Sequence, residues 1–478
     1  MILLASSLFL RADRKQLERM RPYSPLATLL VASALRERGH EVAFFDATLA
    51  DGVQDFVAML SETKPALVGI LEDNFNFLTK MCTVRTRETT LAMVAAAHAQ
   101  GCRVAVNGSD SSDRPELYLA AGADAVLPGE ADVSFLALAD AWRESRDAAL
   151  ADLPGLIYAD GSGGVAHTSH AHSVRDLDAL PLPAWDLVNI GQYRTAWTDA
   201  HGRFSWNMIS ARGCPFGCNW CAKPIFGRRY AQRSPESVAH EIQMLRAAVR
   251  PDHIWFADDI FGLTAKWVTR FAEEVTARHV RTPFMMQCRA DLLRPNVVAA
   301  LAAAGAEEVW IGVESGSQRI LDAMDKGTTV DEVRTATRAL KAYGIRACWF
   351  LQLGYPSETW EDLLLTRDLV REVKPDDIGV SVAYPLPGTK FHEMVHSQLG
   401  AHTNWQHTDD LAMLFHGTYT SAFYRVLRDA LHDEVRTGVE DDERWSALVR
   451  DERLYRSPAP MMPLPSAQAL LALNEGVA

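Results

Sequence analysis

Three cysteines stand close together near the middle of the chain, in the segment SARGCPFGCNWCAKPIFGRRY. Cys214, Cys218 and Cys221 form a Cys-x-x-x-Cys-x-x-Cys run. Three thiolates at this spacing can bind three irons of a [4Fe–4S] cluster and leave the fourth iron without a protein ligand. An iron with an open position can bind a substrate or a second cofactor. The run therefore predicts reaction chemistry more than a structural metal.

Simpler roles for these cysteines fit the sequence less well. A structural zinc site normally uses four ligands, often as two pairs, and no second Cys pair or finger-like Cys/His pair lies near the run. A disulfide framework is typical of short secreted chains, whereas this chain has seven cysteines in 478 residues and shows no secretory leader. The remaining cysteines are expected to be buried, unreactive thiols: Cys82, Cys102, Cys288 and Cys348.

Length and charge limit the partners of the chain. It is long enough for two or three domains, and 48% of its residues are hydrophobic, which is enough for a large core. A net charge of −13 disfavours a general nucleic-acid surface, which would be basic. No apolar run approaches the roughly 20 residues of a membrane span. We therefore expect a cytoplasmic protein with no nucleic-acid or membrane partner.

The first 150 residues alternate short apolar runs with amphipathic stretches. Strands are predicted over residues 1–6, 41–46, 66–71, 103–107 and 123–127, and helices over 25–38, 53–62, 88–100, 116–121 and 134–142. This alternation is typical of a doubly wound, flavodoxin-like α/β domain with a parallel sheet. Ligands of such sheets bind beyond the carboxyl ends of the strands. The candidate binding residues there are Ser109, Ser111, Ser112 and Gly129. No G-x-G-x-x-G or P-loop indicates a dinucleotide or an NTP.

Residues 151–200 are expected to form a linker with a hairpin, because Gly and Pro are dense there. The segment includes HTSHAH, with His167, His170 and His172. Closely spaced histidines can bind a metal. No Cys or carboxylate completes the set locally, and alternation with Thr and Ser suits an exposed hairpin better.

Residues 201–397 predict six β/α units and hence a partial (β/α)6 barrel. Strands are expected over residues 206–211, 253–257, 284–288, 308–313, 346–353 and 378–383, and helices over 234–248, 265–278, 295–304, 330–343 and 360–372. In barrels of this kind the reactive groups lie at the carboxyl ends of the strands. The residues expected there are Asp258, Asp259, Arg289, Gly312, Glu314, Ser315 and Gly354. For the acids, solvated loop charge or helix capping is the other interpretation.

The Cys run, with Trp220 before its third Cys, resembles the radical S-adenosylmethionine (SAM) superfamily. The segments FADDIFG, IGVESGSQRILDAMDKGTT, LGYPSETWEDLLLT and AYPLPGT are similar to the later strand ends of that family. The resemblance implies that the open iron takes the amino and carboxylate groups of SAM, and that one electron cleaves SAM to methionine and a 5′-deoxyadenosyl radical. It places Asp258 and Asp259 near the SAM amino group. It implies that Glu314 accepts from ribose hydroxyls or the SAM ammonium, and that Arg289 pairs with the carboxylate.

The first third resembles the cobalamin-binding domain that precedes many radical SAM domains. The similar segments are RPYSPLATLLVASALRERGHEVAFFDAT and VAVNGSDSSDRPELYLAAGADAVLPGEAD. The resemblance implies that the nucleotide tail of cobalamin lies along the sheet edge near the three serines and Gly129. The chain has no Asp-x-His-x-x-Gly, so the lower ligand of cobalt is left open. The alternative is a flavodoxin-like domain that binds nothing.

These patterns together predict a cobalamin-dependent radical SAM enzyme, similar to the group of anaerobic magnesium-protoporphyrin ester cyclases and cobalamin-dependent methyltransferases. The expected reaction is methylation of an unactivated carbon of a small molecule, with a flavodoxin or ferredoxin as electron donor. Oxidative cyclisation or another radical rearrangement is the alternative. A tRNA-modifying radical SAM enzyme is disfavoured by the acidic charge, and a sensor would need an output domain.

The last segment, residues 398–478, predicts a small helical cap or tail. A helix is expected over residues 421–435, where apolar residues recur along one face. A cap over an open barrel would exclude water from radicals. Plain packing against the barrel is the alternative.

Overall fold

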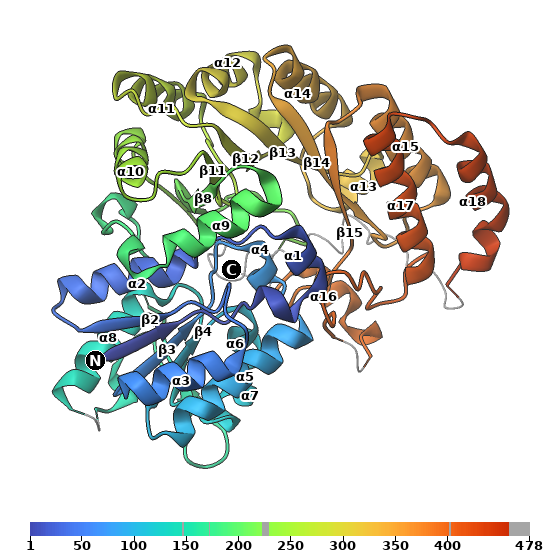
Figure 1. The fold of residues 1–478 in the computed structure, drawn as a ribbon. Coiled ribbons are helices and arrows are strands. Elements are labelled where there is room, and N and C mark those ends of the chain that lie inside the picture. The colour runs from blue at the N-terminus through green and yellow to red at the C-terminus, as the bar shows by residue number, and fades with distance from the viewer. Residues whose placement is uncertain (146–147, 172, 222–228, 401–402, 458–478) are drawn as a thin grey trace. The chain divides into compact units, whose positions relative to one another are not determined.

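The fold is described from a computed structural model (Figure 1). The structure describes residues 1–145, 148–171, 173–221, 229–400 and 403–457. The chain divides into two compact units. The first comprises Met1–Cys214, Lys223–Asp259 and Asn404–Asp409, and the second comprises Pro215–Ala222, Ile260–Thr403 and Asp410–Ala478. The predicted domain boundaries at residues 150, 200 and 397 stay predictions.

A seven-stranded sheet forms the centre of the first unit, in the order β2-β1-β3-β4-β5-β6-β7. Its strands are β1 (Ile2–Ala5), β2 (Val42–Phe45), β3 (Leu67–Leu71), β4 (Arg103–Asn107), β5 (Ala125–Leu127), β6 (Ile157–Ala159) and β7 (Val165–His167). The first five pair in parallel. Every residue of β1 and of β3 is buried, as expected for a parallel sheet that is covered on both faces.

Strands β6 and β7 form the hairpin that the sequence predicts between residues 151 and 200. They pair antiparallel with each other, and β6 joins the edge of the sheet at β5. His167 at the end of β7 and His170 after it are exposed, as expected for a solvated hairpin. His172 lies outside the described residues.

Helices cover both faces of this sheet (Figure 1). One face carries α2 (Leu26–Glu37) and α8 (Ala131–Glu144), and the other carries α3 (Val53–Thr63), α5 (Val84–Ala99) and α7 (Pro115–Ala120). Phe56, Met93 and Tyr118 of the second set pack into one core with the strands. On the first face, Phe135 approaches Gly69 so closely that a Cβ on the glycine would overlap the ring. The predicted doubly wound α/β fold is confirmed.

Short helices occupy three loops that the hydrophobic pattern leaves irregular. They are α1 (Arg14–Arg19), α4 (Phe77–Lys80) and α6 (Ser109–Asp113). None exceeds 6 residues, which is too short for a 3.6-residue period to be visible in the sequence.

The first unit also includes the start of the second region of predicted β/α units. Strands β8 (Ser205–Met208) and β11 (His253–Phe256) pair in parallel, and β9 (Ala211–Gly213) pairs antiparallel with β10 (Tyr230–Gln232). Helices α9 (Ile190–His201) and α10 (Pro235–Ala248) accompany them. The single strand expected over residues 206–211 is therefore two strands. It breaks because the backbone N–H groups of Ser210 and Ala211 donate to the Asp258 carboxylate and not to a neighbouring strand.

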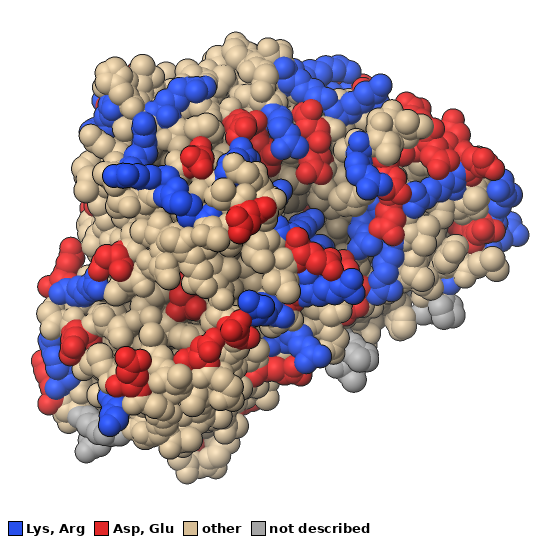
Figure 2. All heavy atoms as spheres, viewed as in Figure 1, with Lys and Arg blue, Asp and Glu red and all other residues tan. Residues whose placement is uncertain are grey.

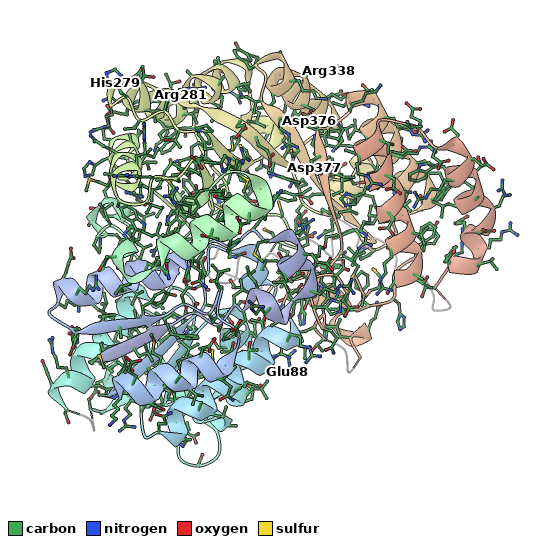
Figure 3. All side chains as sticks on the ribbon, in the orientation of Figure 1. Glu88, His279, Arg281, Arg338, Asp376 and Asp377 are labelled. Atoms are coloured by element: carbon green, nitrogen blue, oxygen red, sulfur yellow. The ribbon has the colours of Figure 1, made fainter. Side chains whose placement is uncertain are left out.

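Four parallel strands form the centre of the second unit. In sheet order they are β15 (Asp377–Val382), β14 (Arg346–Leu353), β13 (Ala306–Glu314) and β12 (Phe284–Cys288). The helices of these β/α units are α11 (Ala265–Ala277), α12 (Pro295–Ala304), α13 (Gln318–Ala323), α14 (Val330–Ala342) and α15 (Trp360–Val373). At the amino end of β15, the Asp376 carboxylate accepts the Ala347 N–H at 2.8 Å (Figure 3). The carboxyl ends of the strands bear the candidate site.

The second unit ends in α16 (Lys390–Val395), α17 (Ser421–Thr437) and α18 (Asp442–Tyr455). The Arg371 guanidinium of α15 forms ion pairs with Glu434 and Asp442, and the Trp360 ring contacts the rings of Phe423 and Trp445. The helical C-terminal region is thus confirmed and packs firmly on α15, while its role in excluding water stays a prediction. None of the helices that the structure describes is long and apolar enough to cross a membrane.

Candidate cofactor sites

The cysteine run begins directly after β9, and Asp258 anchors that strand. Asp258 Oδ1 accepts the backbone N–H of Ser210 at 2.8 Å and also that of Ala211. Burial raises the pKa of the Asp258 carboxyl to about 7. Asp258 therefore holds the backbone that leads into Cys214, whereas its predicted contact with SAM, and that of partly exposed Asp259, stay predictions.

Arg289 lies beside the second cysteine. Its Nη1 is 3.9 Å from Cys218 Sγ, and the guanidinium stacks 3.8 Å from the Phe216 ring centroid. The same side chain donates to the carbonyls of Lys326 at 2.7 Å and Gly327 at 3.2 Å. A positive charge next to a sulfur stabilises the thiolate that binds a metal. The predicted pairing of Arg289 with the SAM carboxylate stays a prediction.

Asn219, which the sequence reading missed, holds the loop between the last two cysteines. Its side chain donates to the Ala323 carbonyl at 2.8 Å and accepts from the Tyr355 hydroxyl at 3.1 Å. Its backbone N–H donates to Met324 O, and its own carbonyl accepts the Phe391 N–H. A buried Asn with this many partners fixes the loop, and nothing in the local sequence pattern distinguishes it from a loop Asn.

The neighbouring Trp220 is partly buried. Its ring packs against the buried cluster that includes Ile320, Met324 and Tyr355, and the Lys326 ammonium lies 5.8 Å from the ring centroid. The aromatic residue before the third cysteine therefore joins the cysteine loop to the core of the second unit.

A buried ion pair follows β13. Glu314 Oε1 accepts from Lys326 Nζ at 2.7 Å, and the two side chains are 5% and 6% exposed. The backbone of Glu314 has φ +65°, an unfavourable conformation that is common at functional sites. A Cβ on Gly312 would lie 2.7 Å from Lys326 Nζ and 2.8 Å from Glu314 Oε1. A larger residue in place of this glycine, which the sequence singled out, would therefore displace the ends of both side chains, and Lys326 is a second residue that the sequence reading missed.

Ser315, next to Glu314, stabilises the turn itself. Its hydroxyl lies 3.3 Å from the Thr366 hydroxyl and accepts the Ser317 N–H at 3.1 Å. These partners hold the turn onto α15. The predicted contact between Ser315 and SAM stays a prediction.

A second glycine turn follows β14. Gly354 has φ +77°, and its N–H donates to Glu358 Oε2 at 2.6 Å. Burial raises the pKa of the Glu358 carboxyl to about 8, so this acid is neutral at pH 7. A Cβ on Gly354 would lie 3.0 Å from Met413 and 3.1 Å from Tyr424. Only glycine combines this backbone conformation with such close packing.

The three serines predicted to contact a nucleotide tail lie in α6. The Ser109 hydroxyl donates to the Thr79 carbonyl at 2.8 Å, and those of Ser111 and Ser112 donate to Gly108 O at 3.2 and 2.6 Å. The hydroxyls therefore stabilise the loop after β4. Their contact with a ligand stays a prediction.

A small open cavity lies at the carboxyl ends of β3, β4 and β5. Its lining combines apolar and polar residues: Ala27, Val31, Leu71, Asn74, Phe75, Asn107, Glu130, Ala131, Asp132 and Arg212. A chain of amides crosses it, because Asn74 donates to Asn107 at 2.8 Å and Asn107 donates to the Gly129 carbonyl at 2.9 Å. Gly129 has φ +72°. This is the sheet edge at which the sequence predicts a ligand.

Two buried polar atoms after β3 lack a hydrogen-bond partner in the described part of the chain, Glu72 Oε2 and Asn74 Oδ1. Each such atom costs about 1–3 kcal/mol when it stays unsatisfied. Burial raises the pKa of the Glu72 carboxyl to about 8, so at pH 7 it offers a hydrogen-bond donor. A donor and an acceptor at one sheet edge fit a ligand with polar, uncharged groups.

The cysteines fit an iron–sulfur cluster chemically. All seven cysteines are described and none is in a disulfide. Cys214 is buried, while Cys218 and Cys221 are partly exposed. Within the described ranges, no three side chains of His, Cys, Asp or Glu are gathered as a metal site, so the assignment of the three thiols as ligands stays a prediction. Arg289 beside Cys218 provides the charge that a cluster thiolate needs.

Residues 208–370 match the radical SAM superfamily. The chain therefore contains a radical SAM domain, which covers about a third of its length. Its matched region begins in β8, includes the three cysteines and ends within α15. The match supports an enzyme that uses a [4Fe–4S] cluster and SAM, which are the cofactors of that superfamily.

Individual relatives extend the likeness beyond this region. An uncharacterized methyltransferase of Pyrococcus horikoshii is 27% identical over 387 residues, which cover 80% of this chain and 81% of the relative. The anaerobic magnesium-protoporphyrin IX monomethyl ester cyclase of Rubrivivax gelatinosus is 29% identical over 267 residues, 55% of this chain and 47% of the cyclase. The chain thus matches about half the length of that cyclase.

A solved structure shares the fold. TsrM of Kitasatospora setae, a radical SAM methyltransferase with cobalamin and a [4Fe–4S] cluster bound, superposes with a TM-score of 0.68 at 21% identity. The match covers 84% of this chain and 79% of TsrM. It therefore extends over most of both chains and includes more than the radical SAM region.

Proposed function

We propose that this radical SAM enzyme is cobalamin-dependent and methylates an unactivated carbon of a small-molecule substrate. The observation that carries the proposal is the cavity at the carboxyl edge of the first sheet, with the partnerless Asn74 Oδ1 in its lining. A parallel sheet binds its ligand at this edge. The fold shared with a cobalamin-carrying methyltransferase and the likeness to a second methyltransferase over 80% of the chain support it.

In this proposal Cys214, Cys218 and Cys221 hold the cluster, and Trp220 packs behind their loop. When bound, the cluster supplies the electron that cleaves SAM to methionine and a 5′-deoxyadenosyl radical, and cobalamin supplies a methyl carrier. Arg289 balances the negative charge of the Cys218 thiolate. Asn219 keeps the loop in place through its bonds to Ala323 and Tyr355.

The carboxyl ends of β13 and β14 provide groups for SAM. The amino acid part of SAM has an ammonium and a carboxylate, which the Glu314 carboxylate and the Lys326 ammonium complement in charge. Gly312, near the end of β13, and Gly354, at the turn after β14, are also proposed neighbours of SAM. Asp258, Asp259 and Ser315 complete the proposed SAM contacts.

The carboxyl edge of the first sheet provides groups for cobalamin. The rim of a corrin bears primary amides, each with N–H donors and a carbonyl acceptor. Asn74 Oδ1 can accept such an N–H, and the protonated Glu72 can donate to such a carbonyl. Ser109, Ser111, Ser112 and Gly129 are the proposed neighbours of the nucleotide tail.

Oxidative cyclisation is the second candidate reaction. The observation that favours it is the 29% identity to the magnesium-protoporphyrin ester cyclase, which is higher than the 27% identity to the methyltransferase. Coverage favours methyl transfer, because the cyclase match extends over 55% of this chain and the methyltransferase match over 80%.

An external electron donor, a flavodoxin or a ferredoxin, completes the proposed system, because the radical SAM reaction consumes one electron in each SAM cleavage. We place the enzyme in the cytoplasm, where thiols stay reduced. Lys and Arg alternate with Asp and Glu over the face in Figure 2. A mixed surface of this kind, with a net charge of −13, suits a small-molecule substrate better than a nucleic acid.

Anaerobic SAM turnover tests the function. The reconstituted protein is incubated with SAM, hydroxocobalamin and a reductant, and S-adenosylhomocysteine and 5′-deoxyadenosine are quantified. We expect both products. 5′-Deoxyadenosine alone would favour cyclisation, and neither product would contradict the proposal.

A matched variant tests the cluster ligands in the same assay. Replacing Cys214, Cys218 and Cys221 together with Ala should abolish cluster absorbance and SAM cleavage. The control replaces Cys348 with Ala, a buried thiol on β14, and should keep both. Retained SAM cleavage in the triple variant would contradict the assignment.

A further inference from the structure

A buried arginine joins the cavity of the first unit to the strand that precedes the cysteine run. The Arg212 side chain is 2% exposed. Its guanidinium grips the Asp132 carboxylate with two bonds of 2.9 and 3.0 Å, and lies 3.6 Å from Glu130 Oε2. Its Cζ is 5.5 Å from the Phe75 ring centroid. All four residues line the cavity.

The two carboxylates that contact Arg212 belong to the loop after β5 and the start of the helix that follows it. Glu130 is the N-cap residue of α8, and Asp132 lies in the first turn of that helix, where a negative charge is favourable. Glu130 also accepts the Val174 N–H at 3.1 Å. The preceding Gly129 carbonyl accepts from Asn107. A ligand that enters the cavity therefore meets the loop that the arginine grips.

Arg212 itself belongs to β9 and lies two residues before Cys214. The β9 backbone is held on one side by β10, where Arg212 pairs with Ala231, and on the other by Asp258, which accepts from Ser210 and Ala211. A strand held on both sides moves as one body, so the hydrogen bonds between Arg212 and Asp132 set where Cys214 lies relative to the loop after β5. Cys214 is the first residue after the strand that is able to bind iron.

We propose that Arg212 is a positioning residue that couples occupancy of the cavity to the geometry of the cysteine loop. This inference rests on the proposed function, in which the cavity takes cobalamin and the loop holds the cluster. A planar guanidinium that forms two hydrogen bonds to one carboxylate fixes the orientation of that carboxylate. A flexible ammonium does not fix it. The coupling is reciprocal: the cluster raises the affinity for the corrinoid, and the corrinoid raises the affinity for the cluster by the same factor.

The test measures the dissociation constant of hydroxocobalamin for the full chain with and without its cluster, by anaerobic equilibrium dialysis. The wild-type protein should bind about tenfold more tightly with the cluster, within the usual range of coupling between two sites. Arg212→Lys keeps the charge and loses the grip. It should bring the ratio of the two constants close to one.

Two further variants keep the test decisive. Asp132→Asn keeps the shape of the side chain and weakens its hydrogen bonds to Arg212, so it should lower the ratio of the two dissociation constants. This variant tests the coupling even if the Arg212 variant does not fold. The control is Arg233→Lys, because Arg233 is a buried arginine paired with Glu241 that does not line the cavity. This control should keep the wild-type ratio.

The outcomes separate the coupling from the proposed function. A tenfold ratio that persists in both the Arg212 and Asp132 variants would overturn the coupling, and so would an equal loss in the Arg233 control. A wild-type protein that takes up no hydroxocobalamin would overturn the proposed function itself.

Discussion

Replacing Lys326 with Met should destabilise the second unit strongly. The change removes the cation of a pair whose side chains are 6% and 5% exposed and whose atoms lie 2.7 Å apart. Glu314 would then keep a buried negative charge without its partner. Breaking a buried pair on one side costs about 3–5 kcal/mol, and we expect a loss of unfolding free energy within that range.

Removing both charges should cost much less than removing one. In the double variant Lys326→Met/Glu314→Gln no charge is buried, and replacing a buried pair with neutral groups of similar size is often close to neutral. We therefore expect the double variant to regain about 2–4 kcal/mol of the loss.

Urea unfolding of the cluster-free protein at pH 7 measures these differences, with circular dichroism as the signal and the slope of each transition compared among variants. The control is Lys341→Met in α14 of the same unit. Lys341 is 36% exposed and lies 4.0 Å from Asp376, so its loss should cost under about 1 kcal/mol. A Lys326 variant no less stable than this control, or a double variant no more stable than the single one, would refute the reasoning.

Further predictions concern three other buried positions. Burial raises the pKa of Glu358 from 4.5 to about 8, so between these pH values the folded state retains a proton that the unfolded chain has lost. The stability of the wild type should therefore fall relative to Glu358→Gln as the pH rises from 5 to 8, by about 3–4 kcal/mol; parallel urea-midpoint curves for the two proteins would contradict this. Gly312→Ala should lower the thermal midpoint and weaken SAM binding in calorimetry, because its Cβ would lie 2.7 Å from Lys326 Nζ; unchanged binding would argue against SAM at this turn. Asn219→Ala should reduce iron incorporation to below about half of wild type, because the cysteine loop loses its bonds to Ala323 and Tyr355; full iron content in a metal assay would show that the loop does not need them.

The local pattern of apolar and polar residues predicted most of the strands and helices. The strand over residues 103–107 and the helix over 295–304 coincide with β4 and α12, because buried parallel strands are continuous apolar runs and the helix has Pro at its start and Gly after its end. The strand over residues 206–211 was wrong as a single element. Its break depends on the Asp258 carboxylate, about 48 residues away in sequence, which no local period contains.

Some residues of the site could be recognised in the sequence, and others only in the structure. Glycines 312 and 354 stood out in the sequence because glycine at a strand end signals a turn or a close approach. Asn219 and Glu358 did not, since a polar residue in a loop is ordinary until its partners are known. Their importance follows from burial, which turns ordinary hydrogen bonds into requirements.

The sequence by itself determined the type of chemistry and the order of the elements. The spacing of Cys214, Cys218 and Cys221 indicated an open cluster, and the alternation of strands and helices indicated two parallel α/β arrangements, because both signals are local. Only the tertiary structure decided which charges are paired. Arg212 meets Asp132 across 80 residues and Arg289 meets Cys218 across 71. In the interior of the protein an unpaired charge is too costly to remain. Such pairs therefore form only when the tertiary fold brings both partners together away from water.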